Sequence, residues 1–299
     1  MCQMVIQRNQ SSQYKSTMNA DWNTFQSTDR QLEEIATDIR ESQPLTSLQC
    51  DLSSLQLTYD RGSKFETCLQ YLQDSLHYRK VRTVRGDGNC YYRAFLYSLC
   101  EACCTNITTT TTTTTTETTP DRKDAILEIL QNSINLVETY GYERFTIEMF
   151  WEELMEFMQS LPKDFHDELN QENGLSDYAT WYLRILTAMH LKSDPDRFLP
   201  YIEGSLVLDN YNNTQSTSTT DLVTSFCRLE VEPMGKECGM VQVIALAEAL
   251  GVQVKIEYVD GHDVIPTTHT VGPEDSKIIL TLLYRPGHYD ILYQDIPKE

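Results

Sequence analysis

The apolar residues of this chain change their spacing near residue 251, and that change limits the folds open to it. Before this point they recur every three or four positions, as in helices; after it they alternate with polar residues, as in strands. The helical patterns cover residues 65–80, 91–101, 121–140, 144–161, 176–192 and 241–250, and the strand patterns cover 252–259, 277–285 and 288–295. The sequence therefore predicts an α/β (α+β) fold in which a helical N-terminal half packs on a sheet built mainly from C-terminal strands.

Polar and low-complexity segments divide the chain into parts. Residues 1–27 are polar and irregular and are predicted to be flexible, residues 28–45 form a short helical arm, and residues 46–299 form the main domain. Two insertions interrupt that domain, one near 105–120 that contains nine consecutive threonines and one at 209–221. The threonine run has no apolar face to bury, so it is predicted to be a disordered surface segment, and the second insertion is polar.

The arm carries a narrow apolar stripe with charged flanks. A helix of this kind can pack on the core of its own domain, or it can bind a partner through the same stripe, and periodicity does not separate the two. The stripe consists of Leu32, Ile35, Ala36 and Ile39.

Net charge and chain length limit the classes of function open to this protein. The 299 residues can bury a substantial core, and the formal net charge is −20. Nucleic-acid binding requires clustered Lys and Arg, so a basic protein partner fits this charge better. No apolar run approaches the roughly 20 residues of a membrane span, and residues 1–16 lack the apolar core of a signal peptide. We therefore expect an intracellular protein without a nucleic-acid or membrane partner, cytoplasmic with the nucleus as an open alternative.

The segment VRGDGNCYYRAFLYSLCE places Cys90 at the start of a predicted amphipathic helix. Asn89 is suited to cap that helix, so that Cys90 lies where unpaired amides and the helix dipole favour a thiolate. A buried structural Cys fits the same pattern, and a base elsewhere is needed to decide. The apolar face of the helix follows Tyr91 at helical spacing, with Ala94, Phe95, Ser98 and Leu99.

The remaining cysteines indicate neither disulfides nor a metal site. Nine is an odd number, and their irregular spacing in a chain of this length favours reduced thiols. Cys100, Cys103 and Cys104 are clustered, but no second pair or nearby His completes a set of four zinc ligands. We expect no metal and no cofactor.

A candidate base lies in the closing strand, within YRPGHYDILY. His288 and Asp290 are two positions apart on an extended segment and share one face, whereas Tyr289 points to the other. The carboxylate can fix the imidazole tautomer and leave the second ring nitrogen to accept the proton of Cys90. From these residues alone the pairing is a hypothesis, and a Cys-dependent acyl transfer of any kind would satisfy it.

The segments GDGNCYYRAF and RPGHYDILY resemble the ovarian tumour (OTU) class of cysteine deubiquitinases, specifically its otubain branch, peptidase family C65. Four further segments are similar to otubain segments in otubain order: DYATWYLRILTA, FLPYIEG, EVEPMGKEC and VIALAEALGVQVKIEYVDG. The resemblance covers roughly residues 30–295. It implies a papain-like OTU fold that hydrolyses the isopeptide bond after the C-terminal glycine of ubiquitin, with ubiquitin and polyubiquitin as partners.

The resemblance also implies residue roles. Cys90 is the nucleophile, His288 is the general base and then acid, and Asp290 is the orienting carboxylate. Asp87 matches an aspartate that otubains also place in the active site, and the backbone of Asp87, Gly88 and Cys90 would form the oxyanion hole. Because a bare carboxylate facing the oxyanion would oppose catalysis, a structural role is favoured for the Asp87 side chain.

Substrate contacts and an alternative function follow from the same resemblance. Gly86 stands where many otubains have Pro, and residues 237–243 lack the acidic and histidine pair that familiar otubains carry beside the site. The alternative function is a non-catalytic inhibitor that binds ubiquitin and ubiquitin-conjugating enzymes. The substrate-binding candidates are one strand residue and three arm residues, namely Tyr289, Leu32, Ile35 and Ile39.

Overall fold

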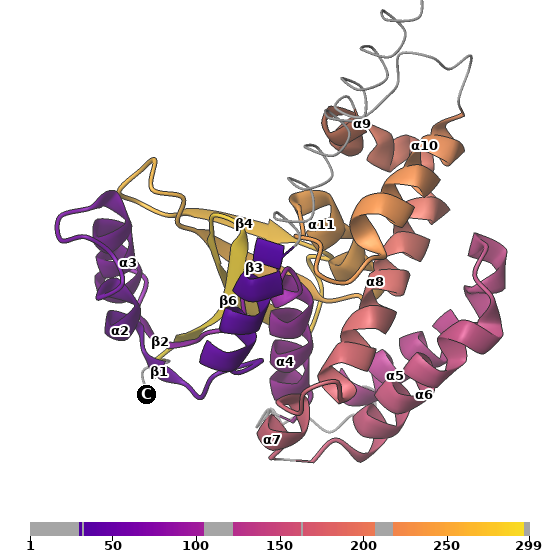
Figure 1. Cartoon of the computed structure of the whole chain (residues 1–299), viewed down its shortest axis with the longest axis horizontal. Coiled ribbons are helices and arrows are strands. Elements are labelled where there is room, and N and C mark those ends of the chain that lie inside the picture. The colour runs from indigo at the N-terminus through magenta and orange to yellow at the C-terminus, as the bar shows by residue number, and fades with distance from the viewer. Residues whose placement is uncertain (1–29, 32, 105–121, 163, 207–217, 296–299) are drawn as a thin grey trace, which may run out of the picture. The chain divides into compact units, whose positions relative to one another are not determined.

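A computed structural model describes residues 30–295, apart from 32, 105–121, 163 and 207–217 (Figure 1). The chain divides into two compact units, Met1–Gln43 and Pro44–Glu299. In the first unit, residues 30–31 and 33–42 are helical, as predicted for the arm. The predicted flexible N-terminus, the threonine-rich insertion and Leu32 lie outside the described residues.

The second unit contains a six-stranded sheet in the order β1-β2-β6-β5-β3-β4. Neighbouring strands are antiparallel except β3 and β5, which are parallel. Four of the six strands come from the C-terminal part of the chain, which confirms the predicted fold class. The strands are β1 Cys50–Asp51, β2 Tyr78–Arg82, β3 Gln253–Tyr258, β4 Thr267–Val271, β5 Ile279–Arg285 and β6 His288–Gln294.

Helices pack on both faces of this sheet. In Figure 1, α2 and α3 lie on one side of it, and α4, α8 and α11 lie on the other. The strands alternate accordingly, because Leu282 joins the core beneath α4 and α8 whereas Leu283 joins the core beneath α2 and α3. The helices are α2 Leu52–Gln56, α3 Lys64–Asp74, α4 Cys90–Cys104, α5 Arg122–Ser133, α6 Arg144–Ser160, α7 His166–Leu169, α8 Leu175–Ser193, α9 Pro195–Leu206, α10 Thr219–Phe226 and α11 Met240–Ala249, with 3-10 turns at Ile134–Leu136 and Glu138–Tyr140 and a π-helical turn at Cys227–Val231.

Helix α4 is buried around its whole circumference. Every residue from Cys90 to Cys100 is buried, because β5 and β6 cover one side of the helix and α8 covers another. The prediction of an amphipathic helix is therefore wrong. Cys100 and Cys103 are core residues of this packing, and among the described residues no group of His, Cys, Asp or Glu could hold a metal ion.

Two element boundaries differ from the sequence prediction. The helix predicted for residues 65–80 ends at Asp74, and the chain then passes through a left-handed conformation at His77, with φ 59°, into strand β2. The polar stretch predicted as an insertion to residue 221 ends earlier. The Ser218 side chain caps α10 by accepting the Asp221 N–H at 3.2 Å.

No helix in the described part of the chain is long and apolar enough to cross a membrane.

Candidate active site

The turn before α4 fixes the backbone around Cys90. Gly88 has φ +77°, and a Cβ at this position would lie 2.0 Å from the carbonyl oxygen of Gly235. A side chain is therefore excluded there by close approach as well as by conformation. The turn is seated directly against the segment that contains Gly235, and Cys90 follows as the first residue of α4.

Asn89 does not cap the helix through its side chain, contrary to prediction. Its Oδ1 accepts hydrogen bonds from Arg184 Nη2 at 2.8 Å and from the Gly235 N–H at 2.9 Å. The amide oxygen therefore ties the turn to α8 and to the neighbouring loop. Two donors from other parts of the chain use this oxygen in place of a local N–H, and one of them, the Arg184 guanidinium, is fully buried and needs an acceptor.

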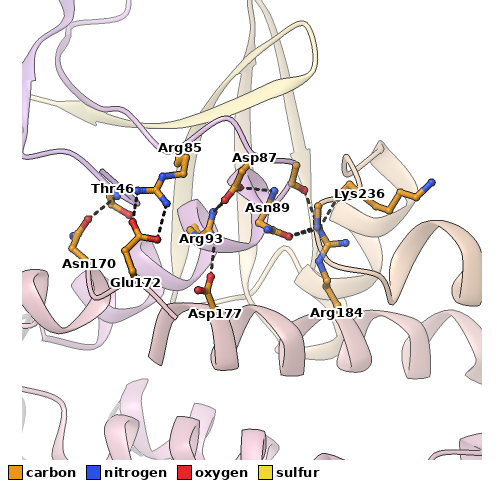
Figure 2. Close-up of polar contacts among 12 residues, drawn as sticks. Thr46, Arg85, Asp87, Asn89, Arg93, Asn170, Glu172, Asp177, Arg184 and Lys236 are labelled. Atoms are coloured by element: carbon orange, nitrogen blue, oxygen red, sulfur yellow. Dashed lines mark hydrogen bonds and ion pairs between the residues drawn. The ribbon is translucent and has the colours of Figure 1, made fainter. Parts of the chain in front are cut away.

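The Asp87 carboxylate points toward Arg93 and Asn89 (Figure 2). It accepts from Arg93 Nη1 at 2.5 Å and from the Asn89 N–H at 3.0 Å. Arg93 also binds Asp177 on α8 at 2.7 Å. These contacts support the structural role favoured for Asp87, since the carboxylate neutralises a buried guanidinium and closes the turn.

His288 and Asp290 lie on one face of β6, with His288 Nε2 2.9 Å from Asp290 Oδ1. Asp290 is fully buried and also accepts from the Val84 N–H at 3.0 Å and from Arg285 Nε at 3.1 Å. Several donors thus hold one carboxylate, which in turn fixes the imidazole ring. Because Nε2 faces Asp290, Nδ1 is the ring nitrogen left for the thiol.

The His288 ring is poised as a cation. Burial alone would lower its pKa, but hydrogen bonds with Asp290 and with Cys90 outweigh burial and raise the pKa to about 9. Burial would likewise raise the pKa of Asp290, yet the bond from His288 and the charge of Arg285 hold it below its ordinary value. The structure thus brings Cys90, His288 and Asp290 together: Asp290 is hydrogen-bonded to His288, and the interaction of His288 with Cys90 contributes to its raised pKa.

The predicted substrate contacts fare differently. Tyr289 is 2% exposed and packs edge-on against Tyr91 and Tyr284, so the prediction that it binds substrate is wrong. Its aromatic ring fills the core beneath α4 instead. On the arm, Ile35 is 55% exposed and Ile39 is partly buried. The backbone oxyanion hole at the Gly88 turn stays a prediction.

Sequence reasoning missed two arginines of the site. Arg285 precedes the turn before His288 and binds Asp290, and Arg184 lies among the buried positions of α8 and binds the Cys90 turn. A signal was available for the second, because a charged residue among buried helix positions needs polar partners. Its partners, however, come from loops whose positions a single sequence does not give.

A thiol, an imidazole and a buried carboxylate in hydrogen-bonded succession define a cysteine hydrolase. The chain belongs to the otubain family, because the family model described as Peptidase C65 Otubain matches residues 38–294. This confirms the resemblance seen in the sequence.

Relatives and solved structures agree with that assignment. Human "Ubiquitin thioesterase OTUB1" is 33% identical over 273 residues, which is 88% of each chain. The Arabidopsis thaliana "OVARIAN TUMOR DOMAIN-containing deubiquitinating enzyme 1" is 33% identical over 266 residues, covering 81% of this chain and 78% of the relative. The structure of h/ceOTUB1 with ubiquitin aldehyde and UBC13~Ub matches with a TM-score of 0.73 at 25% identity, covering 91% of this chain and 98% of that one.

Proposed function

We propose that this protein is a thiol-dependent deubiquitinase that cleaves isopeptide bonds in polyubiquitin. The observation that carries the proposal is the hydrogen-bonded series of Cys90, His288 and Asp290 in an otubain-family chain. The curated relatives are ubiquitin thioesterases, and they match over nearly the whole catalytic unit.

The geometry supports a two-step acyl transfer. His288 Nδ1 takes the thiol proton, and Cys90 Sγ attacks the carbonyl carbon of the C-terminal glycine of ubiquitin. The imidazolium then gives its proton to the leaving lysine amine, and a thioester remains on Cys90. Water hydrolyses this thioester with His288 as base, while Asp290 remains charged and holds the ring throughout.

The test is a panel of linkage-defined di-ubiquitins, with the full chain and the Cys90→Ala variant assayed side by side. Cleavage by the wild type alone supports the proposal, whereas cleavage that survives in Cys90→Ala would remove Cys90 from the mechanism. The wild type could cleave no linkage and still react with a ubiquitin probe that carries a thiol-reactive group at its C-terminus. In that case the site is competent and the isopeptide assignment fails.

A second function is favoured by a specific observation. Solved structures of OTUB1 with ubiquitin aldehyde and a ubiquitin-charged conjugating enzyme match this chain over about nine tenths of its length. We propose that this chain also binds charged conjugating enzymes and inhibits ubiquitin transfer. The Cys90→Ala variant should then still slow chain synthesis by UBC13~Ub, whereas unaltered synthesis would remove this function.

The helical arm is our candidate for the surface that contacts the proximal ubiquitin. Its Ile35 side chain is exposed, as a partner-binding face requires. Deleting residues 1–41 should weaken cleavage of di-ubiquitin but spare hydrolysis of a fluorogenic amide on mono-ubiquitin, which needs only the distal site. A parallel loss of both activities and of the melting temperature would instead make the arm part of the core.

A further inference from the structure

Arg184 is the largest fully buried side chain of the molecule's described part, and it lies on α8 beside the Cys90 turn. Its guanidinium carbon is 4.4 Å from the centre of the Tyr92 ring, two residues beyond the nucleophile. Arg184 carries a positive charge, yet 0% of its surface is exposed. Such burial is costly unless polar partners surround the charge.

The partners of Arg184 come from both loops beside the site (Figure 2). Nη2 donates to the Gly88 carbonyl at 2.9 Å and to the Lys236 carbonyl at 2.8 Å, in addition to the bond with Asn89 Oδ1. Nη1 donates to the Val231 carbonyl at 2.9 Å. One guanidinium therefore joins the turn before Cys90 to both ends of the segment 231–236.

The residue after that segment, Glu237, lies against the turn that precedes His288. A Cβ on Gly287 would lie 3.3 Å from Glu237 Oε1, so residue 237 is against the turn that leads into β6. Residues 231–237 are thus in contact with both catalytic segments, and Arg184 is bonded to their two ends. A shift of Arg184 would be transmitted to the nucleophile and to the loop beside the base.

Among the described residues no carboxylate is hydrogen-bonded to Arg184, in contrast to the buried Arg93 nearby. Each of its acceptors is a neutral carbonyl or amide oxygen, and its Nε has no partner among the described residues. Arg93, by comparison, binds two carboxylates, Asp87 and Asp177. Burial lowers the pKa of the Arg184 guanidinium, and nearby groups, with Tyr92, Cys238 and Asp87 ahead of Cys90, act in the opposite direction.

We propose that Arg184 is a positioning residue for the nucleophile: it locks the Gly88–Asn89 turn against residues 231–236, and its positive charge lies beside the turn that presents the Cys90 sulfur. This inference rests on the proposed function, since it concerns the same site. The hydrogen bonds to the surrounding carbonyl and amide oxygens explain how the guanidinium is retained in the core.

The experiment compares Arg184→Lys and Arg184→Gln with a control on another element, Lys255→Met. Lys255 is a partly buried cation of β3 that is paired with the buried Glu257 at 3.0 Å, outside the segments that Arg184 joins. Two readouts are measured in the full chain. They are the rate of Cys90 alkylation by iodoacetamide as a function of pH, and kcat and KM on a fluorogenic mono-ubiquitin amide.

The Gln variant should shift its alkylation profile to higher pH by about one unit, and its kcat should fall about 100-fold with little change in KM, as for a misplaced reacting group. The Lys variant retains the charge and should keep the alkylation profile while losing kcat. Lys255→Met should lower the melting temperature but leave both readouts unchanged.

Unaltered alkylation profiles and kcat in both Arg184 variants, with only a lower melting temperature, would overturn the proposal. If the Gln variant does not fold, the Lys variant still decides, because wild-type kcat in it would exclude positioning by the planar guanidinium. Alkylation needs no ubiquitin, so it reports on this inference even if the wild type cleaves no ubiquitin substrate.

Discussion

The turn before α4 and strand β6 each bring one aspartate to the site, and the two are used differently. Asp290 is fully buried and faces the base, accepting from His288, Arg285 and the Val84 N–H. Asp87 is three residues from the nucleophile in sequence, yet its side chain is 26% exposed and is committed to Arg93 and its own turn.

The comparison shows that the donors facing a carboxylate decide its role, and distance along the chain does not. The aspartate near Cys90 in sequence shapes the backbone, whereas the one 200 positions away sets the charge of the imidazole. If the distinction holds, loss of the nucleophile Cys90 should have the largest effect on catalysis, and loss of the Asp87 carboxylate should have the smallest.

Cys90→Ala should abolish cleavage, with kcat falling by roughly 10⁶-fold, because the nucleophile itself is removed. Ubiquitin binding should persist, since the thiol offers little contact area. Steady-state cleavage of di-ubiquitin and calorimetric binding of mono-ubiquitin measure the two effects. Residual cleavage near the wild-type rate would exclude Cys90 as the nucleophile.

Asp290→Asn should lower kcat by roughly 10²- to 10⁴-fold, since His288 keeps a hydrogen-bond partner but loses charge stabilisation and its correct tautomer. The measurement is kcat on a fluorogenic mono-ubiquitin amide, with circular dichroism as a control for folding. An unchanged rate would transfer the orienting role to another group and would end the distinction between the two aspartates.

Stability should depend on pH through His288. Its pKa rises from 6.5 to about 9 on folding, so the folded state gains free energy that is complete below pH 6.5 and is lost as the pH rises through 9. The loss amounts to roughly 3 kcal/mol at most. Urea unfolding between pH 6 and 10 should show this decline in the wild type, and a flatter profile in His288→Gln. Equal slopes in both proteins would contradict the raised pKa.

Asp87→Asn should have the smallest effect. Arg93 keeps its bond to Asp177, so the free energy of unfolding should fall by roughly 1–3 kcal/mol. We expect kcat to fall by less than about tenfold, because the carboxylate does not face the reacting atoms. Denaturant unfolding and the mono-ubiquitin assay test this pair of values. A loss of kcat as large as that of Asp290→Asn would make Asp87 a second orienting group.

Much of the fold followed from periodicity, and the failures have a shared cause. The patterns predicted α6, α8, α11, β3, β5 and β6, and strand alternation placed His288 and Asp290 on one face. Periodicity reports which residues are buried within one element, but not what covers them. It therefore predicted an amphipathic helix for α4, which is covered on all sides. It also predicted that Tyr289 is exposed, although α4 lies over this residue.

The site was predictable where its parts lie close in sequence, and hidden where distant segments meet. Asn89 is a good helix cap by local chemistry, but its oxygen is taken by Arg184 and by the Gly235 N–H. The pairing of Cys90 with His288 was available only as a hypothesis or through family resemblance. Contacts that span 100 to 200 residues leave no local pattern to read.

The burial of α4 ties the nucleophile to the cooperativity of the whole domain. Exposed helices fray and open locally, but a helix covered on every side opens only when its neighbours separate from it. Amide hydrogens in the Cys90 turn of α4 should therefore exchange with solvent at the rate of global unfolding. The enzyme then has no partly folded state in which the thiol is exposed while the domain survives, so the reactive sulfur is presented only by the intact fold.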